Sequence, residues 1–388
     1  MKIAKILLGD PANQKGFFNS VMERTKHLME AESDVDCYMI RLEYGFVLRL
    51  LKRQFRKSQR EEFSTIQGIK FKNLWITMGL LDYLLTYRLH RRAILDSKQL
   101  NNYVPLFKDY DLLSTHGIDA IFLSARVKKE FNIPFVTTWH GSDINVMPFR
   151  SNSIKNEVKQ LLDSADHNFF VSQKLLETSE KISIEAKKSV LYTGPAKSFY
   201  PYDEEDKKAL REKYNVNTKY VVGFIGNFVS IKNVLVLPAL FKKIQEEVQD
   251  VSFVIVGNGE LGNLLESKLI EQSINNLHIL GKLNPEEIPD IMNFLDLLVL
   301  PSLNEGFPLV TLEAQACGVH VVGSNRGGIP ESIGEENCFE LDDDFVERAT
   351  FRVIELLKNK IEQPVLSKDF SWDNVIEKEL LVHNSVVF

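Results

Sequence analysis

The sequence of 388 residues has few cysteines and no long apolar segment. Cys37, Cys317 and Cys338 are widely spaced and form no C-x-x-C pair, so neither a disulfide framework nor a cysteine-based zinc site is indicated. The first residues contain too short an apolar run for a secretory signal, and no later stretch approaches the roughly 20 residues of a membrane-spanning helix. We therefore expect a cytoplasmic protein that is soluble or peripherally attached to the cytoplasmic face of a membrane.

Several catalytic motifs are also missing. The sequence contains no G-x-S-x-G nucleophile elbow, no H-E-x-x-H and no Walker loop, which argues against serine hydrolases, zinc proteases and P-loop enzymes. The acidic residues 342–344 could bind a metal, but they lie at an expected helix start, where a solvated cap is commoner. We expect neither a metal nor a bound cofactor.

Charge is distributed unevenly along the chain. Residues 1–200 hold 30 Lys and Arg against 22 Asp and Glu, whereas residues 201–388 hold 17 against 31. Part of the basic excess alternates with apolar residues, at Arg49, Lys52, Arg53, Arg56 and Lys57. Such a segment can lie on an anionic membrane or contact a lipid-linked acceptor, and it can equally be a solvated amphipathic helix. No nucleic-acid reading module accompanies the charge, so we expect no nucleic-acid partner.

Strand-like and helix-like segments alternate throughout, which predicts an α/β protein with parallel sheets covered by helices. The strands are expected near residues 3–8, 35–40, 70–76, 112–115, 135–139, 168–171 and 189–192, then near 220–225, 253–256, 278–280, 297–300, 319–322 and 338–341. A turn-rich passage at residues 193–201 separates the two series. The length and this break predict two lobes, each with its own core.

The most informative segment runs from Pro301 to Gly318. An apolar strand precedes it, Pro308 suits the first turn of a helix, and Gly318 suits the helix end. Backbone N–H groups at such a helix start attract an anion. Two carboxylates, Glu305 and Glu313, flank this helix start, and a carboxylate beside an anion is tolerable where it accepts hydrogen bonds from hydroxyls. The pattern predicts a site for a sugar carried on a phosphate.

This segment resembles the E-x7-E signature of retaining glycosyltransferases of family 4, with Glu305 and Glu313 separated by seven residues. The residues that carry the resemblance are Glu305, Gly306, Phe307, Pro308, Glu313, Ala314, Ala316 and Gly318. The resemblance implies the GT-B fold, in which two facing Rossmann-like lobes enclose a cleft. The expected lobes are an acceptor-binding lobe at residues 1–198 and a donor-binding lobe at 199–369, with a C-terminal helix at 370–388 that returns to the first lobe.

Other segments resemble the same family. Lys232 falls at the lysine position of a phosphate-binding loop, but Asn227 stands where arginine is usual. His140 lies in an H-G-x-D loop. His116, at another strand end, is a weaker candidate for the cleft, and a packing role is an equal alternative for it. The resemblance implies catalytic roles for His140, Lys232 and Glu305. It implies donor contacts for Gly16, Asn227, Lys232, Leu283, Glu305, Gly306, Phe307, Pro308, Leu309 and Glu313.

The expected activity is transfer of a sugar, with retention at the anomeric carbon, from a nucleotide-diphosphate donor, for which we expect UDP. The expected acceptor is a hydroxyl of a lipid-linked molecule or a glycan, in surface polysaccharide biosynthesis by analogy with the family. Two alternatives stay open. The first is a catalytically weak sugar-nucleotide binding or assembly protein, which Asn227 at the usual arginine position suggests. The second is an NAD-dependent oxidoreductase, because residues 257–262 match its G-x-G-x-x-G motif. The strand after that motif lacks the acidic residue that would bind ribose hydroxyls.

Overall fold

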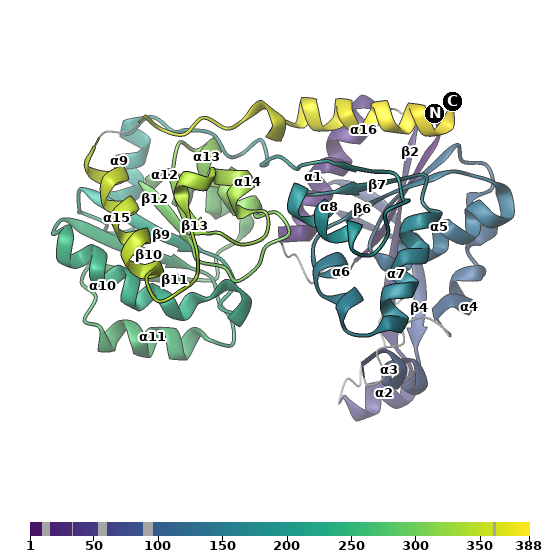
Figure 1. Ribbon diagram of the computed structural model, residues 1–388, viewed down its shortest axis with the longest axis horizontal. Helices are drawn as coiled ribbons and strands as arrows, with labels where there is room; N and C mark the ends of the chain where they lie inside the picture. The colour runs from purple at the N-terminus through teal and green to yellow at the C-terminus, as the bar shows by residue number, and fades with distance from the viewer. Residues whose placement is uncertain (10–15, 33, 53–59, 88–95, 360–361) are drawn as a thin grey trace. The chain divides into compact units, whose positions relative to one another are not determined.

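The computed structural model describes residues 1–9, 16–32, 34–52, 60–87, 96–359 and 362–388. The chain divides into two compact units. Unit 1 contains Met1–Thr193 and Trp372–Phe388, and unit 2 contains Gly194–Ser371. Each unit is an α/β structure built on one sheet (Figure 1).

The sheet of unit 1 has the strand order β3-β4-β2-β1-β5-β6-β7-β8. All pairs are parallel except β3 and β4, which form an antiparallel hairpin at one edge. The strands are β1 Ile3–Leu8, β2 Val35–Tyr44, β3 Phe63–Ile66, β4 Ile69–Met78, β5 Leu112–His116, β6 Phe135–Trp139, β7 His167–Phe170 and β8 Lys188–Val190. Buried apolar side chains on both faces of β1, β5 and β6 are typical of a parallel sheet covered on both sides.

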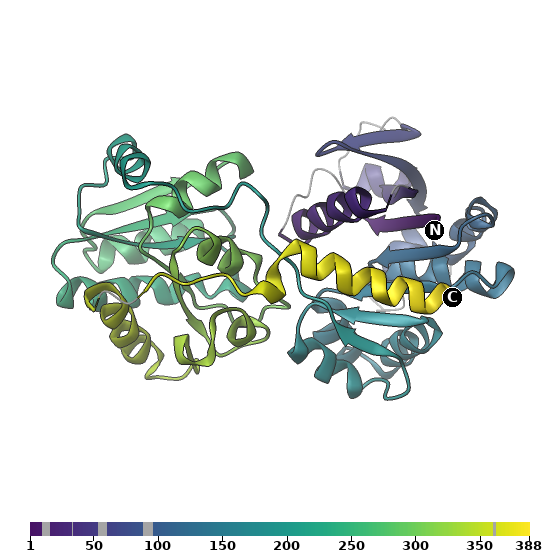
Figure 2. The same cartoon turned by 90° about the horizontal axis from the view of Figure 1, so that it is seen from above.

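Helices connect these strands, as parallel pairing requires. They are α1 Gly16–Ala31, α2 Phe46–Leu51, α3 Leu80–Tyr87, α4 Asp96–Asn101, α5 Ile118–Phe131, α6 Ser142–Asn145, α7 Asn152–Ser164 and α8 Gln173–Glu180, with the C-terminal α16 Trp372–Val387. Helix α1 packs through Phe18, Val21 and Met22 against β1, β2 and β4. Helix α16 packs through Trp372 and Val375 against β5, β6 and β7. Helices α1 and α16 lie side by side, as Figure 2 shows.

The sheet of unit 2 is wholly parallel in the order β11-β10-β9-β12-β13-β14. The strands are β9 Tyr220–Ile225, β10 Val251–Val256, β11 Leu277–Gly281, β12 Leu297–Leu300, β13 His320–Ser324 and β14 Cys338–Phe339. The helices are α9 Glu204–Lys213, α10 Leu237–Glu247, α11 Gly262–Glu271, α12 Ile288–Phe294, α13 Leu309–Ala316, α14 Ile329–Ile333 and α15 Phe345–Lys358.

Two separate apolar cores cover the two faces of this second sheet. One core includes side chains of α10, α11 and α15, and the other includes side chains of α12, α13 and α14. The sheet is therefore doubly wound, and loops at the carboxyl ends of its strands can meet at the point where the strand order reverses, between β9 and β12.

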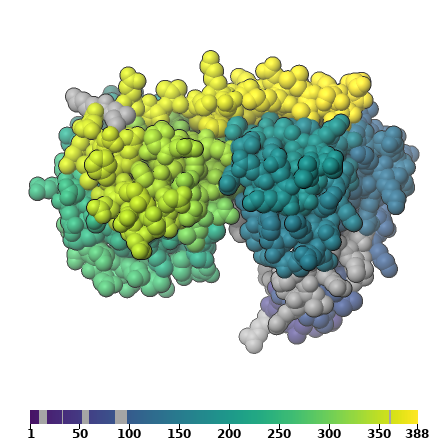
Figure 3. Space-filling view, in the orientation of Figure 1, coloured from purple at the N-terminus to yellow at the C-terminus, as the bar shows by residue number. Residues whose placement is uncertain are grey.

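The predicted fold class is confirmed: the chain has two doubly wound α/β lobes, and its last helix returns to the first lobe. The outer side of α16 is exposed on the surface of unit 1 (Figure 3). Among the described helices, none is both long enough and apolar enough to cross a bilayer.

Candidate active site

Lys232 and Glu305 meet at the carboxyl end of the second sheet. Lys232 ends a short 3-10 helix, Ser230–Lys232, in the loop after β9, and Glu305 lies in the loop after β12. The Lys232 Nζ donates to Glu305 Oε1 at 2.6 Å, and both side chains are mostly buried. A backbone hydrogen bond of 2.8 Å from Leu303 N to the carbonyl of Ile231 joins the same two loops. The structure thus brings together two of the three predicted catalytic residues.

The backbone of Glu305 is held by the loop after β13. The N–H of Gly328 donates to the Glu305 carbonyl at 3.1 Å. Gly327 has φ +59°, and a Cβ added there would lie 2.0 Å from the same carbonyl oxygen. Only glycine permits so close an approach with a left-handed backbone. Gly327 was not among the predicted site residues, although a Gly-Gly pair after a strand is a usable signal for such a contact.

The helix after Glu305 begins one residue later than the sequence predicted. Pro308 is its N-cap residue, with φ −84° and ψ 102°, and α13 begins at Leu309. Both the N–H and the hydroxyl of Thr311 donate to the Pro308 carbonyl, so the proline supplies the first acceptor of the helix. Leu309 and Val310 remain in the first turn, where backbone N–H groups have no partner within the helix. The predicted anion-attracting helix start is therefore present after Gly306 and Phe307.

Glu313 lies one turn into α13, on the partly exposed side of the helix. Burial raises the pKa of the Glu313 carboxyl to about 7. No ion pair or hydrogen bond to this carboxylate is present among the residues that the structure describes. A carboxylate in this state gains from hydroxyl donors, because a hydrogen bond offsets its desolvation.

The glycines of the G-x-G-x-x-G segment have a structural explanation. A Cβ at Gly257 would lie 1.8 Å from the carbonyl oxygen of Gly226, and one at Gly259 would lie 2.3 Å from that of Phe228. Backbone hydrogen bonds join the two loops, from Gly226 to Val256 and from Phe228 to Asn258. These glycines allow the loop after β9, which contains Lys232, to cross the loop after β10. The packing of these two loops therefore explains the glycines without a bound dinucleotide.

Three predicted donor contacts lie at other points. Asn227 is exposed in the loop between β9 and Lys232. Leu283 follows β11 and packs against the core that contains α12 and α13. Gly16 begins α1 in unit 1, while residues 10–15 before it lie outside the described residues.

His140 lies at the end of β6 in unit 1, in contact with His116 at the end of β5. The His116 Nδ1 and the His140 Nε2 are 3.0 Å apart. Burial lowers the pKa of His140 to about 3, with smaller contributions from Arg24 and Lys5, so the ring is neutral at physiological pH. Asp143 accepts hydrogen bonds from the N–H groups of His140 and Gly141, so its carboxylate fixes the backbone of this loop.

The basic segment lies partly outside the described residues. Arg49 is in α2 and Lys52 follows it, whereas Arg53, Arg56 and Lys57 are not described. The Lys52 Nζ lies 4.7 Å from the ring centres of both Tyr44 and Tyr83, so it links α2 to α3. Nothing in these contacts joins the segment to His140.

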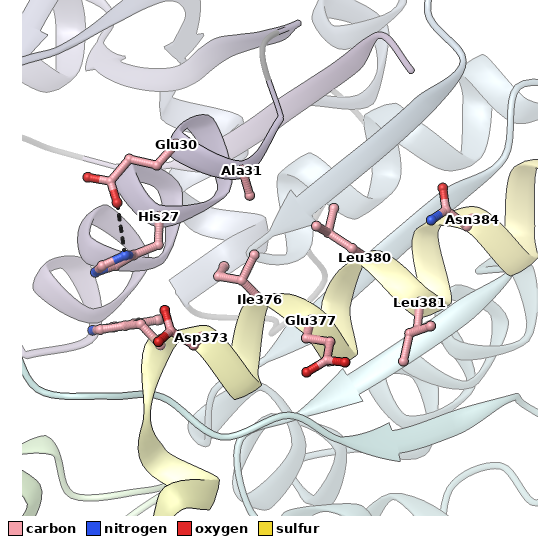
Figure 4. A pocket seen from close by; sticks show the side chains of 10 residues that line it. His27, Glu30, Ala31, Asp373, Ile376, Glu377, Leu380, Leu381 and Asn384 are labelled. Atoms are coloured by element: carbon pink, nitrogen blue, oxygen red, sulfur yellow. Dashed lines mark ion pairs between the residues drawn. The ribbon is translucent and has the colours of Figure 1, made fainter.

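A separate groove of about 510 Å³ lies between α1 and α16 (Figure 4). It is lined by His27, Glu30, Ala31, Trp372, Asp373, Ile376, Glu377, Leu380, Leu381 and Asn384. An ion pair of 3.3 Å joins His27 to Glu30 at one side. None of the predicted site residues lines this groove, and no group of three or more potential metal ligands occurs among the described residues.

Two protein-family models match the two units. The model "Glycosyltransferase Family 4" matches residues 50–194, and "Glycosyl transferases group 1" matches residues 206–369. Together they span well over half of the chain. The two doubly wound lobes are those of the GT-B class of transferases. The chain belongs to the glycosyltransferases of the family 4 type.

Individual relatives agree with this assignment. A glycosyltransferase assigned to teichuronic acid biosynthesis, TuaC of Bacillus subtilis strain 168, is 28% identical over 86% of this chain and 84% of its own. N-acetyl-alpha-D-glucosaminyl L-malate synthase of Bacillus anthracis is 31% identical over 58% of this chain and 59% of its own.

Solved structures share the fold at low sequence identity. Sucrose-phosphate synthase of Thermosynechococcus elongatus has a TM-score of 0.73 at 17% identity and covers 99% of both chains. HepE of Anabaena, solved with UDP and glucose, has a TM-score of 0.71 at 17% identity and covers 98% of this chain and 99% of its own. The oxidoreductase alternative is set aside, because the family matches and the packing of Gly257 and Gly259 account for the residues that suggested it.

The contact between Gly327 and Glu305 gives a first prediction. Gly327→Ala must push the Glu305 loop away, because the added Cβ would overlap a carbonyl oxygen. We expect the free energy of unfolding of unit 2 to fall by more than about 2 kcal/mol, as measured by urea denaturation. Gly281→Ala is the control in the same unit: Gly281 also has a positive φ, of +68°, but has no atom within 4 Å of an added Cβ. It should cost only about 1 kcal/mol. Equal costs for the two variants would contradict the close packing.

Proposed function

We propose that this transferase moves a sugar from a nucleoside diphosphate to a hydroxyl of a lipid-linked or glycan acceptor, with retention at the anomeric carbon and without a metal. The observation that supports this most is the Lys232–Glu305 pair, 2.6 Å long, immediately before the start of α13. It places a cation, a carboxylate and a helix N-terminus within one pair of loops. The cation and the helix N-terminus suit a diphosphate, and the carboxylate suits a sugar hydroxyl.

In this proposal the bond between the anomeric carbon and the diphosphate breaks, and its electron pair stays on the diphosphate. The acceptor oxygen bonds to the anomeric carbon, and the proton of its hydroxyl passes to the leaving diphosphate. Negative charge grows on the leaving group in the transition state, so fixed positive groups accelerate the step. Lys232 and the N–H groups at the start of α13 supply that charge. Asn227, uncharged at the position of the usual arginine, offers hydrogen bonds but no second cation.

The other roles follow from chemistry and from the family resemblance. Glu305 accepts hydrogen bonds from the donor sugar, with Gly306, Phe307, Pro308 and Leu309 forming the loop around it. Glu313 accepts from the ribose, Leu283 lies by the base, Gly16 allows close approach of the backbone, and His140 contacts the sugar. UDP is the proposed nucleotide, since the fold relative HepE was solved with UDP and glucose. Surface polysaccharide synthesis is proposed because TuaC is assigned to teichuronic acid biosynthesis.

Removal of the cation tests the catalytic proposal. Lys232→Ala should lower kcat for sugar transfer by roughly 100-fold to 1,000-fold, the typical cost of losing one group that stabilises the transition state. Release of the nucleoside diphosphate from a donor panel, with an acceptor extract, measures the rate. Lys242→Ala, on the partly exposed face of α10 with only a 3.6 Å ion pair, is the control and should keep full activity. If the wild type binds donor but transfers nothing, the catalytically weak binding protein becomes the better account.

The raised pKa of Glu313 gives a prediction on pH. A ligand whose hydroxyls donate to the ionised carboxylate favours that form, so binding should tighten as pH rises through about 7, the pKa of Glu313 without ligand. Calorimetric titration of UDP between pH 5.5 and 8.5 measures this. Glu313→Gln should remove the part of the pH dependence near 7, while ionisation of the phosphate itself remains in both proteins. An unchanged pH profile in Glu313→Gln would refute the ribose role.

We also propose that α2 and α3 bind an anionic membrane surface that presents the acceptor. Both helices expose large apolar side chains: Phe46 is 69% exposed, Leu51 66% and Leu81 58%. Arg49 and Lys52 lie on or next to α2, which suits anionic lipid headgroups. This cluster of apolar side chains favours membrane contact over a plain solvated helix, because clustered exposed apolar groups are unfavourable in water.

Vesicle binding tests the membrane proposal. The double variant Phe46→Ser with Leu51→Ser should bind phosphatidylglycerol vesicles at least about tenfold more weakly, since each buried side chain of this size contributes about 1.5–3 kcal/mol. Wild-type binding should weaken as salt is raised. Ile270→Ser, at a 70% exposed residue of unit 2, is the control and should bind normally. Equal binding to neutral phosphatidylcholine vesicles, or none to either, would remove this surface from the account.

A further inference from the structure

Unit 1 contains a buried cluster of charged side chains that the transfer chemistry described above does not use. Lys5 on β1, Arg24 on α1, and Glu379 and His383 on α16 are each almost wholly inaccessible to solvent. Arg24 Nε donates to Glu379 Oε2 at 2.7 Å, and Lys5 Nζ lies 3.6 Å from Glu379 Oε1. His383 Nε2 lies 3.5 Å from the same oxygen. One carboxylate of the last helix thus contacts cations from two distant parts of the chain.

The balance of charge in this cluster is positive. Burial alone would raise the pKa of Glu379, but Arg24 and Lys5 outweigh burial and hold that pKa well below its usual value. Burial lowers the pKa of His383 to about 4, so this ring is neutral. Burial also lowers the pKa of Lys5, to about 8, against the opposing effect of Glu379. Near neutral pH, two cations therefore face one anion, and a positive field acts on polar groups nearby.

This cluster reaches the histidine pair through Arg24. Arg24 NH1 donates to Thr138 Oγ1 at 3.0 Å. Thr138 is the register partner of His116 across β5 and β6, and it lies two residues before His140. Lys5 and Ser114 are register partners across β1 and β5, and such partners point to the same side of a sheet. Ser114 and His116 are two residues apart on β5, so they also share a face. Lys5 therefore lies on the same face as His116 and Thr138.

The proton between the two histidines can be assigned from these surroundings. In the 3.0 Å contact one ring nitrogen donates and the other accepts. His116 is fully buried, and its Nε2 has no hydrogen-bond partner among the described residues. A proton on that nitrogen would leave a buried N–H unsatisfied and would face the fields of Lys5 and Arg24. A lone pair there costs less, so His116 holds its proton on Nδ1 and donates it to His140.

We propose that His116 is a positioning residue, which holds His140 as the neutral tautomer protonated on Nδ1, with Arg24 and Glu379 fixing the adjacent strand end. The other ring nitrogen of His140 is then a hydrogen-bond donor, which suits an oxygen of a sugar. What His140 does with that proton rests on the proposed function, whereas the tautomer itself does not.

Nitrogen NMR tests the proposal without an activity assay. Long-range proton–nitrogen spectra of protein labelled with ¹⁵N-histidine distinguish protonated from bare ring nitrogens. The chain has eight histidines, and His140→Asn and His116→Asn assign the two sets of signals. In the wild type we expect a protonated Nδ1 and a bare Nε2 on His140. A protonated Nε2 on His140 would overturn the proposal, and this result needs no variant to fold beyond those used for assignment.

Substitution of His116 tests its causal role. His116→Leu removes the donor, and we expect the Nε2-protonated tautomer of His140 to become populated and kcat to fall about tenfold. His116→Asn places an amide N–H near the position of Nδ1 and should restore the wild-type tautomer and most of the rate. His278→Asn, which removes a histidine from β11 of unit 2, is the control and should change neither. An unchanged His140 tautomer in His116→Leu would overturn the proposal. If the tautomer shifts as expected but His140→Ala transfers sugar normally, positioning stands and the proposed role of His140 fails.

Discussion

Close packing of backbone against backbone at the carboxyl end of the second sheet holds the candidate donor site together. The loop that contains Lys232 crosses the loop after β10 where only glycine fits, at Gly257 and Gly259. The Glu305 loop meets Gly327 in the same way, with Gly328 donating to its carbonyl. These contacts position the two loops so that the Lys232 ammonium and the Glu305 carboxylate lie 2.6 Å apart. A site fixed in this way before a ligand arrives loses little free energy to reorganisation.

Unit 1 depends on a different constraint, the buried ion pairs that hold its last helix. Glu379 contacts Arg24 although the two residues are 355 positions apart. Buried ion pairs contribute little net stability compared with apolar packing, yet removing one partner leaves an unpaired buried charge. We therefore expect such a pair to specify where α16 docks more than it strengthens the fold. The same arginine contacts the strand that ends at His140, so the docking of α16 and the environment of the histidines are linked.

Sequence patterns were sufficient for the fold because they depend on local periodicity. Every strand of unit 2 was expected close to its observed position, and the final helix was also expected. The edge strand β3 was not, since Phe63–Ile66 is short and its pairing with β4 is antiparallel in an otherwise parallel sheet. The site was predictable only where residues lie in one motif, as in the loop from Glu305 to Leu309. The cluster of Lys5, Arg24 and Glu379 has no local pattern, because three distant segments supply it. The roles of the individual site residues stay predictions.

The proposed function requires that unit 2 binds a nucleoside diphosphate and its sugar conjugates, and thermal denaturation with a ligand panel measures this binding. The panel contains uridine, guanosine, adenosine and thymidine diphosphates, their sugar conjugates, and both redox forms of nicotinamide dinucleotide. A ligand that binds the folded state raises its Tm. We expect a selective rise in Tm with one nucleoside diphosphate, UDP, and its sugar conjugate, and we expect Glu313→Ala to abolish this rise. A rise in Tm only with nicotinamide dinucleotides would contradict the proposed function. The absence of a rise with any ligand of the panel would also contradict it.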